Sequence, residues 1–320
     1  VLASSMFFVI FISGAGFAFA VMPMVARAAG VGDDRQVRRV TRMGFWTSAI
    51  FTAVMVPVFV WSGPLFQALG QEAHISLLAQ EYLRILVIGL LPSLLTMVMK
   101  SYLAAMERTQ IVFVITIAGT LFNILLNYML IFGNFGVPEM GIQGAALASV
   151  IVQALTFPAM AVYAGWQIPQ HRLLHRLWRP DAEVFMQVFR LGWPIGMTSL
   201  AEVGLFAASA VMMGWIGTFE LAAHGIALQW ASLAFMVHIG LSNVATIRAG
   251  NAMGRLDEEG MRRGGLVVTA ISVLFAAVVM VVFLAMPEPL ISSFLDRSEP
   301  ARDQVIAIGA VLLAMAALFQ

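Results

Sequence analysis

The chain has 320 residues, of which 61% are apolar and only 11% are charged, and its mean hydropathy is +0.91. A water-soluble domain is roughly half apolar and a quarter charged, so this composition excludes an ordinary soluble protein. The formal net charge of +1 excludes a protein that binds polyanions, because no basic excess is present to displace counterions from nucleic acid. The chain has no cysteine, which excludes disulfides and thiolate chemistry.

Apolar segments of about 20 residues, the length that spans a bilayer as a helix, follow one another along the chain. They are residues 1–25, 44–69, 83–106, 111–132, 142–166, 191–215, 222–247, 265–286 and 304–320. None shows the two-residue alternation of a transmembrane barrel strand, so we expect helices. The sequence therefore predicts an all-α membrane protein, a polytopic helical bundle truncated to about nine helices.

Basic residues gather in alternate loops. Most of the 18 Lys and Arg residues lie in or beside residues 30–42, 107–110, 167–190 and 248–263, with Lys100 counted beside the second of these loops. The opposite loops hold only Arg297 and Arg302, while Arg84 stands at the entrance of a helix on that side. The positive-inside rule predicts that the four arginine-rich loops are cytoplasmic.

An internal repeat relates the first apolar segment to the seventh. Gly32 and Gly254, each beside an arginine-rich stretch, are 222 residues apart, and Pro64 and Pro289, which close the next helix, are 225 apart. The repeating unit is therefore six helices, and an even number keeps the same orientation, as in the parallel repeats of secondary transporters. We infer a parent of twelve helices. Because this sequence begins and stops inside apolar runs, we expect a fragment with helices missing at both ends.

Polar side chains form stripes inside three of the segments, because residues three or four apart share a helix face. The stripes comprise Thr116, Thr120, Asn123 and Asn127; Ser149, Gln153 and Thr156; and Gln229, Ser232 and Asn243. Hydrogen bonding between helices explains any single stripe. Three stripes in one chain favour a hydrated cavity.

Glu202 is the only acidic residue well inside one of these apolar segments. It lies eleven residues after Leu191, which is roughly 16 Å deep and close to the midplane of a ~30 Å hydrocarbon core. Thr198 lies one turn back, and Pro194, two turns back, leaves a helix carbonyl free to help coordinate a cation. The alternative is a neutral, hydrogen-bonded Glu that only packs. A carboxyl at this depth is costly and no Lys or Arg lies at matching depth, so we expect a proton or metal cation as its partner.

His171 and His175 are four residues apart, the spacing of helical metal ligands. They alternate with Arg172 and Arg176, which disfavours cation binding. We expect instead a solvated or headgroup-facing helix over residues 179–190.

Other constellations are weaker. Asp33 and Asp34 are expected in a solvated turn, and His238 is expected to pack on the face opposite Gln229. No nucleophile–base pair, P-loop or dinucleotide fingerprint stands out in the sequence.

The order of glycines and amides along the chain is similar to that of a transporter family. The run Gly119-x3-Asn123-x3-Asn127-x5-Gly133, continued by Gly136, Pro138, Gly141 and Gly144, resembles the helix-5/helix-6 signature of the multidrug and toxic compound extrusion (MATE) family. Gly192-Trp-Pro194 leading to Glu202, and Ala223–Gln229 running on to Thr246–Gly254, resemble its NorM-like branch. The resemblance covers the whole chain, from the second family helix into the tenth.

The resemblance implies two six-helix lobes around a cavity that opens alternately to each side of a bacterial inner membrane. It implies export of organic cations or drugs by antiport with Na⁺ or H⁺, by a monomer without other cofactors, metal sites or nucleic acid. Residues 1–166 would be the N-terminal lobe without its first helix, 167–190 a cytoplasmic linker, and 191–320 a truncated C-terminal lobe with family helices 7–10.

The same resemblance implies roles for individual residues. Glu202 occupies the helix-7 acidic position and would couple the cation, and Pro194 would act as a hinge. The substrate cavity would be lined by Asn123, Asn127, Thr198, Gln229 and Ser232. Gln229 stands where the family usually has Asn. The family's helix-1 and helix-10 aspartates fall outside this chain, so no residue here carries their roles.

Three other functions fit the sequence less well. A flippase for lipid-linked saccharides would carry several cationic residues in its cavity to hold pyrophosphate, and none is evident at depth in the sequence. A membrane-embedded enzyme would need paired carboxylates or a His/metal cluster near one interface, and Glu202 has no such partner in the sequence. A channel or receptor is disfavoured by the parallel six-helix repeat.

Overall fold

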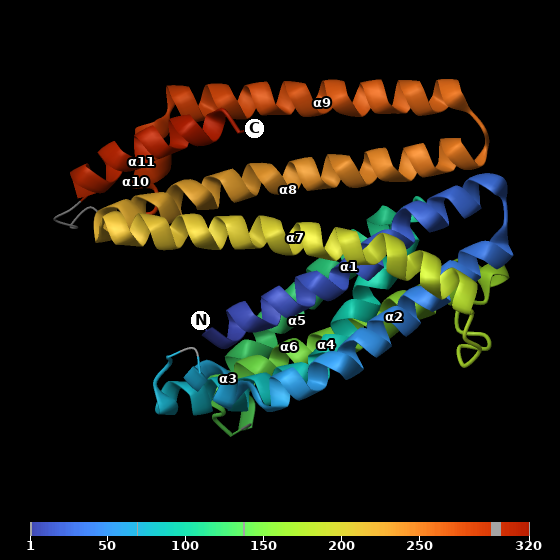
Figure 1. Ribbon diagram of the computed structural model, residues 1–320, viewed down its shortest axis with the longest axis horizontal. Coiled ribbons are helices and arrows are strands. Elements are labelled where there is room, and N and C mark those ends of the chain that lie inside the picture. The colour runs from blue at the N-terminus through green and yellow to red at the C-terminus, as the bar shows by residue number, and fades with distance from the viewer. Residues whose placement is uncertain (1, 69, 137, 296–301, 320) are drawn as a thin grey trace. The chain divides into compact units, whose positions relative to one another are not determined.

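The structure is a computed structural model that describes residues 2–68, 70–136, 138–295 and 302–319. Over these residues it is helical, with no strand (Figure 1). The helices are α1 (Leu2–Val31), α2 (Asp34–Val60), α3 (Ser62–Ala68), α4 (Ala73–Ala105), α5 (Thr109–Phe132), η1 (Asn134–Gly136), α6 (Gly141–Gln167), η2 (Pro169–His171), α7 (Ala182–Ile216), α8 (Thr218–Gly254), α9 (Glu258–Ala285), α10 (Pro287–Ser292) and α11 (Arg302–Ala317). The predicted outer-loop residue Arg297 lies outside the described residues.

Eight of the described helices are long and apolar enough to cross a bilayer, namely α1, α2 and α4 to α9. Each of the nine apolar segments predicted from the sequence overlaps one of the longer helices, and the ninth overlaps α11, which has 16 residues. The protein is therefore a helical, polytopic membrane protein. Several helices begin well before their apolar segment: α2 begins at Asp34 and α7 at Ala182. Of the helix expected over residues 179–190, residues 182–190 are helical and form the first turns of α7.

Local signals in the sequence explain where helices begin and end. Asp33 caps α2 by accepting a hydrogen bond from the backbone N–H of Gln36 at 2.8 Å, and Asp257 caps α9 in the same way by accepting from the backbone N–H of Gly260 at 2.7 Å. An Asp at this position satisfies an amide that has no partner within the helix. Gly133 ends α5 in the left-handed conformation, with φ of 69°. Both Asp-capped helices are followed by a short helix, α3 or α10, which is the order that a repeat predicts.

The chain divides into two compact units, residues 1–200 and 201–320. The division falls inside α7, so the first part of this helix belongs to unit 1 and the remainder to unit 2. The lobes and linker predicted from the sequence stay predictions.

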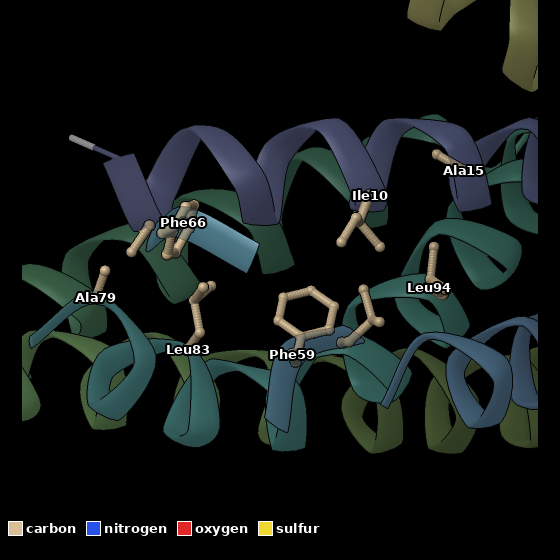
Figure 2. Close-up of a cluster of buried hydrophobic side chains, with 9 residues drawn as sticks. Ile10, Ala15, Phe59, Phe66, Ala79, Leu83 and Leu94 are labelled. Atoms are coloured by element: carbon tan, nitrogen blue, oxygen red, sulfur yellow. The ribbon is translucent and has the colours of Figure 1, made fainter. Parts of the chain in front are cut away.

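The core of unit 1 lies between α1, α2, α3 and α4. Ile10 and Ala15 from α1 meet Phe59 from α2 and Leu83 and Leu94 from α4, all of them almost fully buried (Figure 2). Burying a large apolar side chain in such a cluster contributes roughly 1.5–3 kcal/mol in water, but the bilayer is itself apolar. Close packing therefore has to hold these helices together, and the interlocked aliphatic and aromatic side chains supply it.

Glycines bring the first part of α7 against α1 in unit 1. A Cβ on Gly16 would collide with the backbone of Gly192 and Gly196, and a Cβ on Gly196 would collide with the Ser13 carbonyl. Gly192 and Gly196 are four residues apart, the small-xxx-small spacing that lets two membrane helices approach backbone to backbone. Phe17 of α1 also stacks on Phe189 of α7, with ring centroids 5.6 Å apart.

Unit 2 is built on α8 and α9, which run antiparallel to each other, together with α10 and α11 (Figure 1). Its core contains Ala227 of α8, Phe283 of α9, Ile291 of α10 and Leu313 of α11. The indole of Trp230 donates a hydrogen bond to the Leu290 carbonyl at 2.9 Å, which ties α8 to α10.

Candidate functional site

A polar cavity of about 260 Å³ lies in unit 1 between α4, α5 and α6. It is lined by Lys100 of α4, by Thr116, Gly119, Thr120 and Asn123 of α5, and by Ser149, Val152, Gln153 and Thr156 of α6. Two of the three polar stripes seen in the sequence thus face the same space. A volume of this size accommodates a small ligand, slightly below the ~300 Å³ lower end for drug-sized ligands.

The hydroxyl groups around this cavity present oxygen lone pairs. Thr120 donates its hydroxyl hydrogen to the Thr116 carbonyl at 2.9 Å, Ser149 to Ala145 at 3.1 Å, and Thr156 to Val152 at 2.7 Å. Because each hydroxyl donates its single hydrogen to a carbonyl of its own helix, its oxygen can still accept a hydrogen bond from a ligand. Such a wall suits a ligand that donates hydrogen bonds or carries positive charge.

The two asparagines of α5 are joined to each other. The Asn127 amide nitrogen donates to Asn123 Oδ1 at 2.9 Å, and this bond orients the Asn123 amide at the cavity wall. Asn127 itself lies one turn further along α5, and its Oδ1 is buried without a partner among the described residues. An unpaired buried carbonyl of this kind is costly and marks a position where a water or ligand would be stabilised.

Lys100 is the cavity residue that sequence reasoning missed. It was grouped with the arginine-rich loops, whereas α4 continues to Ala105 and places Lys100 inside the helix, at the wall of the polar cavity. The signal that could have found it is its position inside the third apolar segment. Lys100 thus gives this cavity one cationic residue.

The remaining predicted site residues lie on α7 and α8. Pro194 and Thr198 are exposed on the part of α7 in unit 1, and Glu202 is exposed on the part in unit 2. On α8 of unit 2, Gln229 is exposed, and Ser232 donates its hydroxyl to the Leu228 carbonyl at 2.7 Å. Within the described parts of the chain, no hydrogen bond joins Glu202 to another side chain, and no group of three or more His, Cys, Asp and Glu residues is arranged to hold a metal.

His171 is buried in a contact that the sequence did not predict, whereas its partner Asp34 is exposed, as expected for a solvated turn. His171 is 1% exposed, its Nδ1 lies 2.6 Å from the Tyr102 hydroxyl, and its Nε2 lies 3.1 Å from Asp34 Oδ1. Burial lowers the pKa of His171 below its usual 6.5, although the hydrogen bond to Asp34 opposes this shift. Sequence reasoning missed the contact because its three members come from η2, α4 and α2.

The expected packing role of His238 agrees with its surroundings. Its Nδ1 lies 2.8 Å from the Ser272 hydroxyl of α9, and its ring meets the edge of Phe275 at a centroid distance of 5.3 Å. These contacts join α8 to α9 within unit 2.

Comparison with known proteins identifies the family of the chain. The family model described as MatE matches residues 1–129 and 194–320. Proteins named "Probable multidrug resistance protein NorM" from Agrobacterium fabrum and Rhizobium meliloti are 42% and 43% identical to the chain over its full length. The chain spans 69% of the length of each of these relatives.

Solved structures show the same fold. The chain superposes on a crystal structure of MATE in the straight conformation with a TM-score of 0.81 and 20% identity, covering 99% of this chain and 71% of that one. It also superposes on the structure described as the outward-facing conformation of a multidrug resistance MATE family transporter of the MOP superfamily. There the TM-score is again 0.81 and the identity is 18%, and the match covers 99% of this chain and 70% of that one. The chain therefore belongs to the MATE family, which consists of membrane transporters and not of enzymes.

Proposed function

We propose that the protein exports small organic cations or drugs across a bacterial inner membrane by antiport with Na⁺ or H⁺, through alternating access. The observation that carries the proposal is similarity, over the whole of this chain, to proteins named for multidrug resistance, combined with a polar cavity whose hydroxyl oxygens can accept hydrogen bonds. Asn123 would contact the substrate in this cavity, and Asn127 would orient Asn123 through their 2.9 Å hydrogen bond. Thr198, Gln229 and Ser232 would line the path elsewhere, and Pro194 would act as a hinge of α7.

Glu202 would bind the coupling ion. It lies in the middle of the apolar part of α7. Among the described residues, no side chain forms a hydrogen bond or an ion pair with its carboxylate. A carboxylate in that position is costly without a counterion, which a proton or Na⁺ supplies. Antiport then requires only that the ion and the drug stabilise different conformations, because a ligand shifts an equilibrium by its differential affinity.

A flippase for lipid-linked saccharides is the second candidate within transport, and Lys100 is the observation that favours it. A single ammonium group is a weak site for a pyrophosphate, whose charge normally requires several basic groups. The acceptor-rich wall of the cavity favours the export of cations.

The test is transport by protein reconstituted in liposomes, with pH and Na⁺ gradients imposed separately and efflux of a fluorescent organic cation followed. Glu202→Gln keeps the side-chain volume but cannot ionise, so we expect normal insertion and loss of gradient-driven efflux. Glu202→Asp should be partly active. The matched control is Glu220→Gln, which removes an acid from the first turn of α8 and should transport normally. Normal efflux by Glu202→Gln would show that this residue is structural.

A further inference from the structure

We propose that unit 1 carries a second site, separate from the polar cavity, which binds the phosphate of an anionic phospholipid headgroup. The site is a cavity of about 340 Å³ where the first turns of α2 face the loop between η2 and α7. Four arginines of α2 (Arg35, Arg38, Arg39 and Arg42) and three of the loop line it, together with His175 and Asp181. We call it the arginine cavity.

The positive charge of the arginine cavity greatly exceeds the negative charge placed against it. Asp181 is the only acidic residue among the described residues that line it, and its carboxylate is held by Arg39 Nε at 2.6 Å. That bond holds the pKa of Asp181 below its usual value, so the carboxylate stays ionised and committed to Arg39. Glu183, 3.4 Å from Arg39 Nη2, pairs with the same guanidinium group. Among the residues that line the cavity, no further acidic side chain balances the charge of the other arginines, so an anion would be stabilised there.

Arg42 has a hydrogen-bond donor that an anion could satisfy. Its Nη1 donates to the Arg176 carbonyl at 3.2 Å, but its Nε is buried and has no partner among the described residues. Asp181 attracts its charge, while Arg38, Arg39 and Arg179 lie close enough to repel it. A buried guanidinium N–H without an acceptor is costly, and like charges that lie close together repel each other. Phosphate oxygens would relieve both costs, because they match the planar donors of arginine in pairs.

The cavity is built by fixed elements on both of its sides. The four arginines of α2 follow the spacing i, i+3, i+4 and i+7, which puts them on one helix face. The loop opposite is held in place: the Trp46 indole donates to the Leu177 carbonyl at 2.8 Å, and buried His171 anchors the start of the loop. Arg172 and Arg176 adopt left-handed φ values of 43° and 57°, which side-chain-bearing residues rarely do. Strain of this kind persists only where surrounding contacts impose the conformation.

A lipid headgroup is the source of phosphate that fits the surroundings best. Trp178 and Leu174, on the same loop, are 73% and 50% exposed beside the arginines. Exposed tryptophans with apolar neighbours are typical of the interface between membrane and water. From the arginines, α2 continues directly into its apolar span, so the cavity lies at headgroup depth. In the proposed orientation this is the cytoplasmic face, and basic pockets there bind anionic lipid headgroups.

The experiment measures lipid binding directly and is independent of transport, so its failure would leave the proposed antiport untouched. The purified full chain in neutral detergent is titrated with phosphatidylglycerol, with phosphatidylcholine and with inorganic phosphate, and bound molecules are counted by native mass spectrometry. Arg38→Gln/Arg179→Gln removes two charges from opposite walls of the cavity. Neither side chain makes a hydrogen bond or ion pair in the described parts of the chain, so the fold should be kept. The control is Arg262→Gln/Arg263→Gln, an equal loss of charge from α9, where both arginines pair with Glu259.

We expect phosphatidylglycerol to bind more tightly than phosphatidylcholine. We expect the Arg38/Arg179 variant to bind it roughly 30-fold more weakly, from the usual effect of two basic residues at an anionic surface. The control variant should bind it as the unmodified protein does. Equal binding of the two lipids, or equal weakening in both variants, would overturn the site. Binding of inorganic phosphate with no preference between the lipids would show a soluble anion as the ligand and overturn the assignment to lipid.

Discussion

The hydrogen bonds of His171 assign the charge state of this buried side chain. In the neutral ring, Nε2 carries the hydrogen and donates to Asp34, while Nδ1 accepts from the Tyr102 hydroxyl, so every group in the contact has a partner. A second proton on Nδ1 would turn the Tyr102 bond around and leave the hydroxyl hydrogen without an acceptor there. The geometry and the lowered pKa of His171 therefore agree on a neutral imidazole.

This charge state predicts a pH dependence of stability. Because burial lowers the pKa of His171 in the folded protein below 6.5, the unfolded chain binds the proton more readily. The contribution of His171 to stability is therefore fully present above pH 6.5 and is lost as the pH falls through the folded-state pKa. We expect the thermal midpoint in detergent to fall between about pH 7 and pH 5 more steeply for the unmodified protein than for His171→Gln. His74→Gln, an exposed histidine of α4, should keep the steep slope, and equal slopes for all three proteins would contradict the assignment.

Lys100 allows a test of where the organic cation binds. Two positive charges about 8 Å apart repel by roughly 2 kcal/mol at an effective dielectric constant near 20. If the substrate occupies the polar cavity, Lys100→Gln should therefore tighten the binding of tetraphenylphosphonium roughly tenfold or more, as measured by calorimetry. Lys100→Arg keeps the charge and should leave the affinity close to that of the unmodified protein. Unchanged affinity in Lys100→Gln would mean that the cation binds away from this wall.

At the scale of helices, the contact between α1 and α7 in unit 1 depends on glycine residues, which have no side chain to keep the two backbones apart. Gly16, Gly192 and Gly196 let the two backbones touch, and most of the atoms that an added Cβ would meet are backbone atoms that cannot rotate away. A glycine inside a helix is otherwise unfavourable by roughly 1 kcal/mol relative to alanine. Close packing is thus the physical reason for glycine at these positions.

The same helix supplies a matched pair of substitutions. Gly196→Ala would drive a methyl group into the Ser13 carbonyl, and we expect it to destabilise the protein by roughly 1–3 kcal/mol, the usual cost of overpacking. Gly204→Ala, two turns further along α7, meets no atom within 4 Å and should be neutral or slightly stabilising. Thermal unfolding in detergent measures both variants. A stable Gly196→Ala protein would show that α1 and α7 do not pack in this way.

At the scale of the whole molecule, the outward surface of the helices is apolar. In the most apolar 18 residues of α5, no residue is buried inside the protein. In the corresponding stretch of α7, only 6% of the residues are buried. Side chains such as Phe113, Leu121 and Leu205 are mostly exposed. Water would oppose such a surface, whereas a bilayer accommodates it without cost.

The orientation of the helices in that bilayer is open to a direct test, because the chain has no native cysteine. Arg108→Cys lies in an arginine-rich loop, and Glu139→Cys lies beyond the other end of α5; both native residues are exposed. An impermeant maleimide should label the first only from the cytoplasmic side and the second only from outside. Labelling of both positions from the same side would contradict the orientation.

The class of the protein and its helices follow from the sequence because hydropathy and helix capping are local. A run of about 20 apolar residues needs a bilayer whatever its neighbours do, and an Asp such as Asp33 or Asp257 caps a helix through an amide three residues away. Helix starts were predicted less well. An apolar run ends where charges begin, but the backbone hydrogen bonds of α2 and α7 continue past it.

By itself the sequence determined that this is a polytopic helical membrane protein, that polar stripes run along its helices, and that Glu202 stands alone in an apolar segment. Only the tertiary structure decided which stripes share a cavity, that Lys100 joins them, that His171 is buried against Asp34, and that the arginines of α2 meet those of the loop 172–179. The reason is physical. These contacts join residues far apart in the chain, and they depend on how each helix is rotated about its axis, which a periodic pattern leaves free until the helices pack.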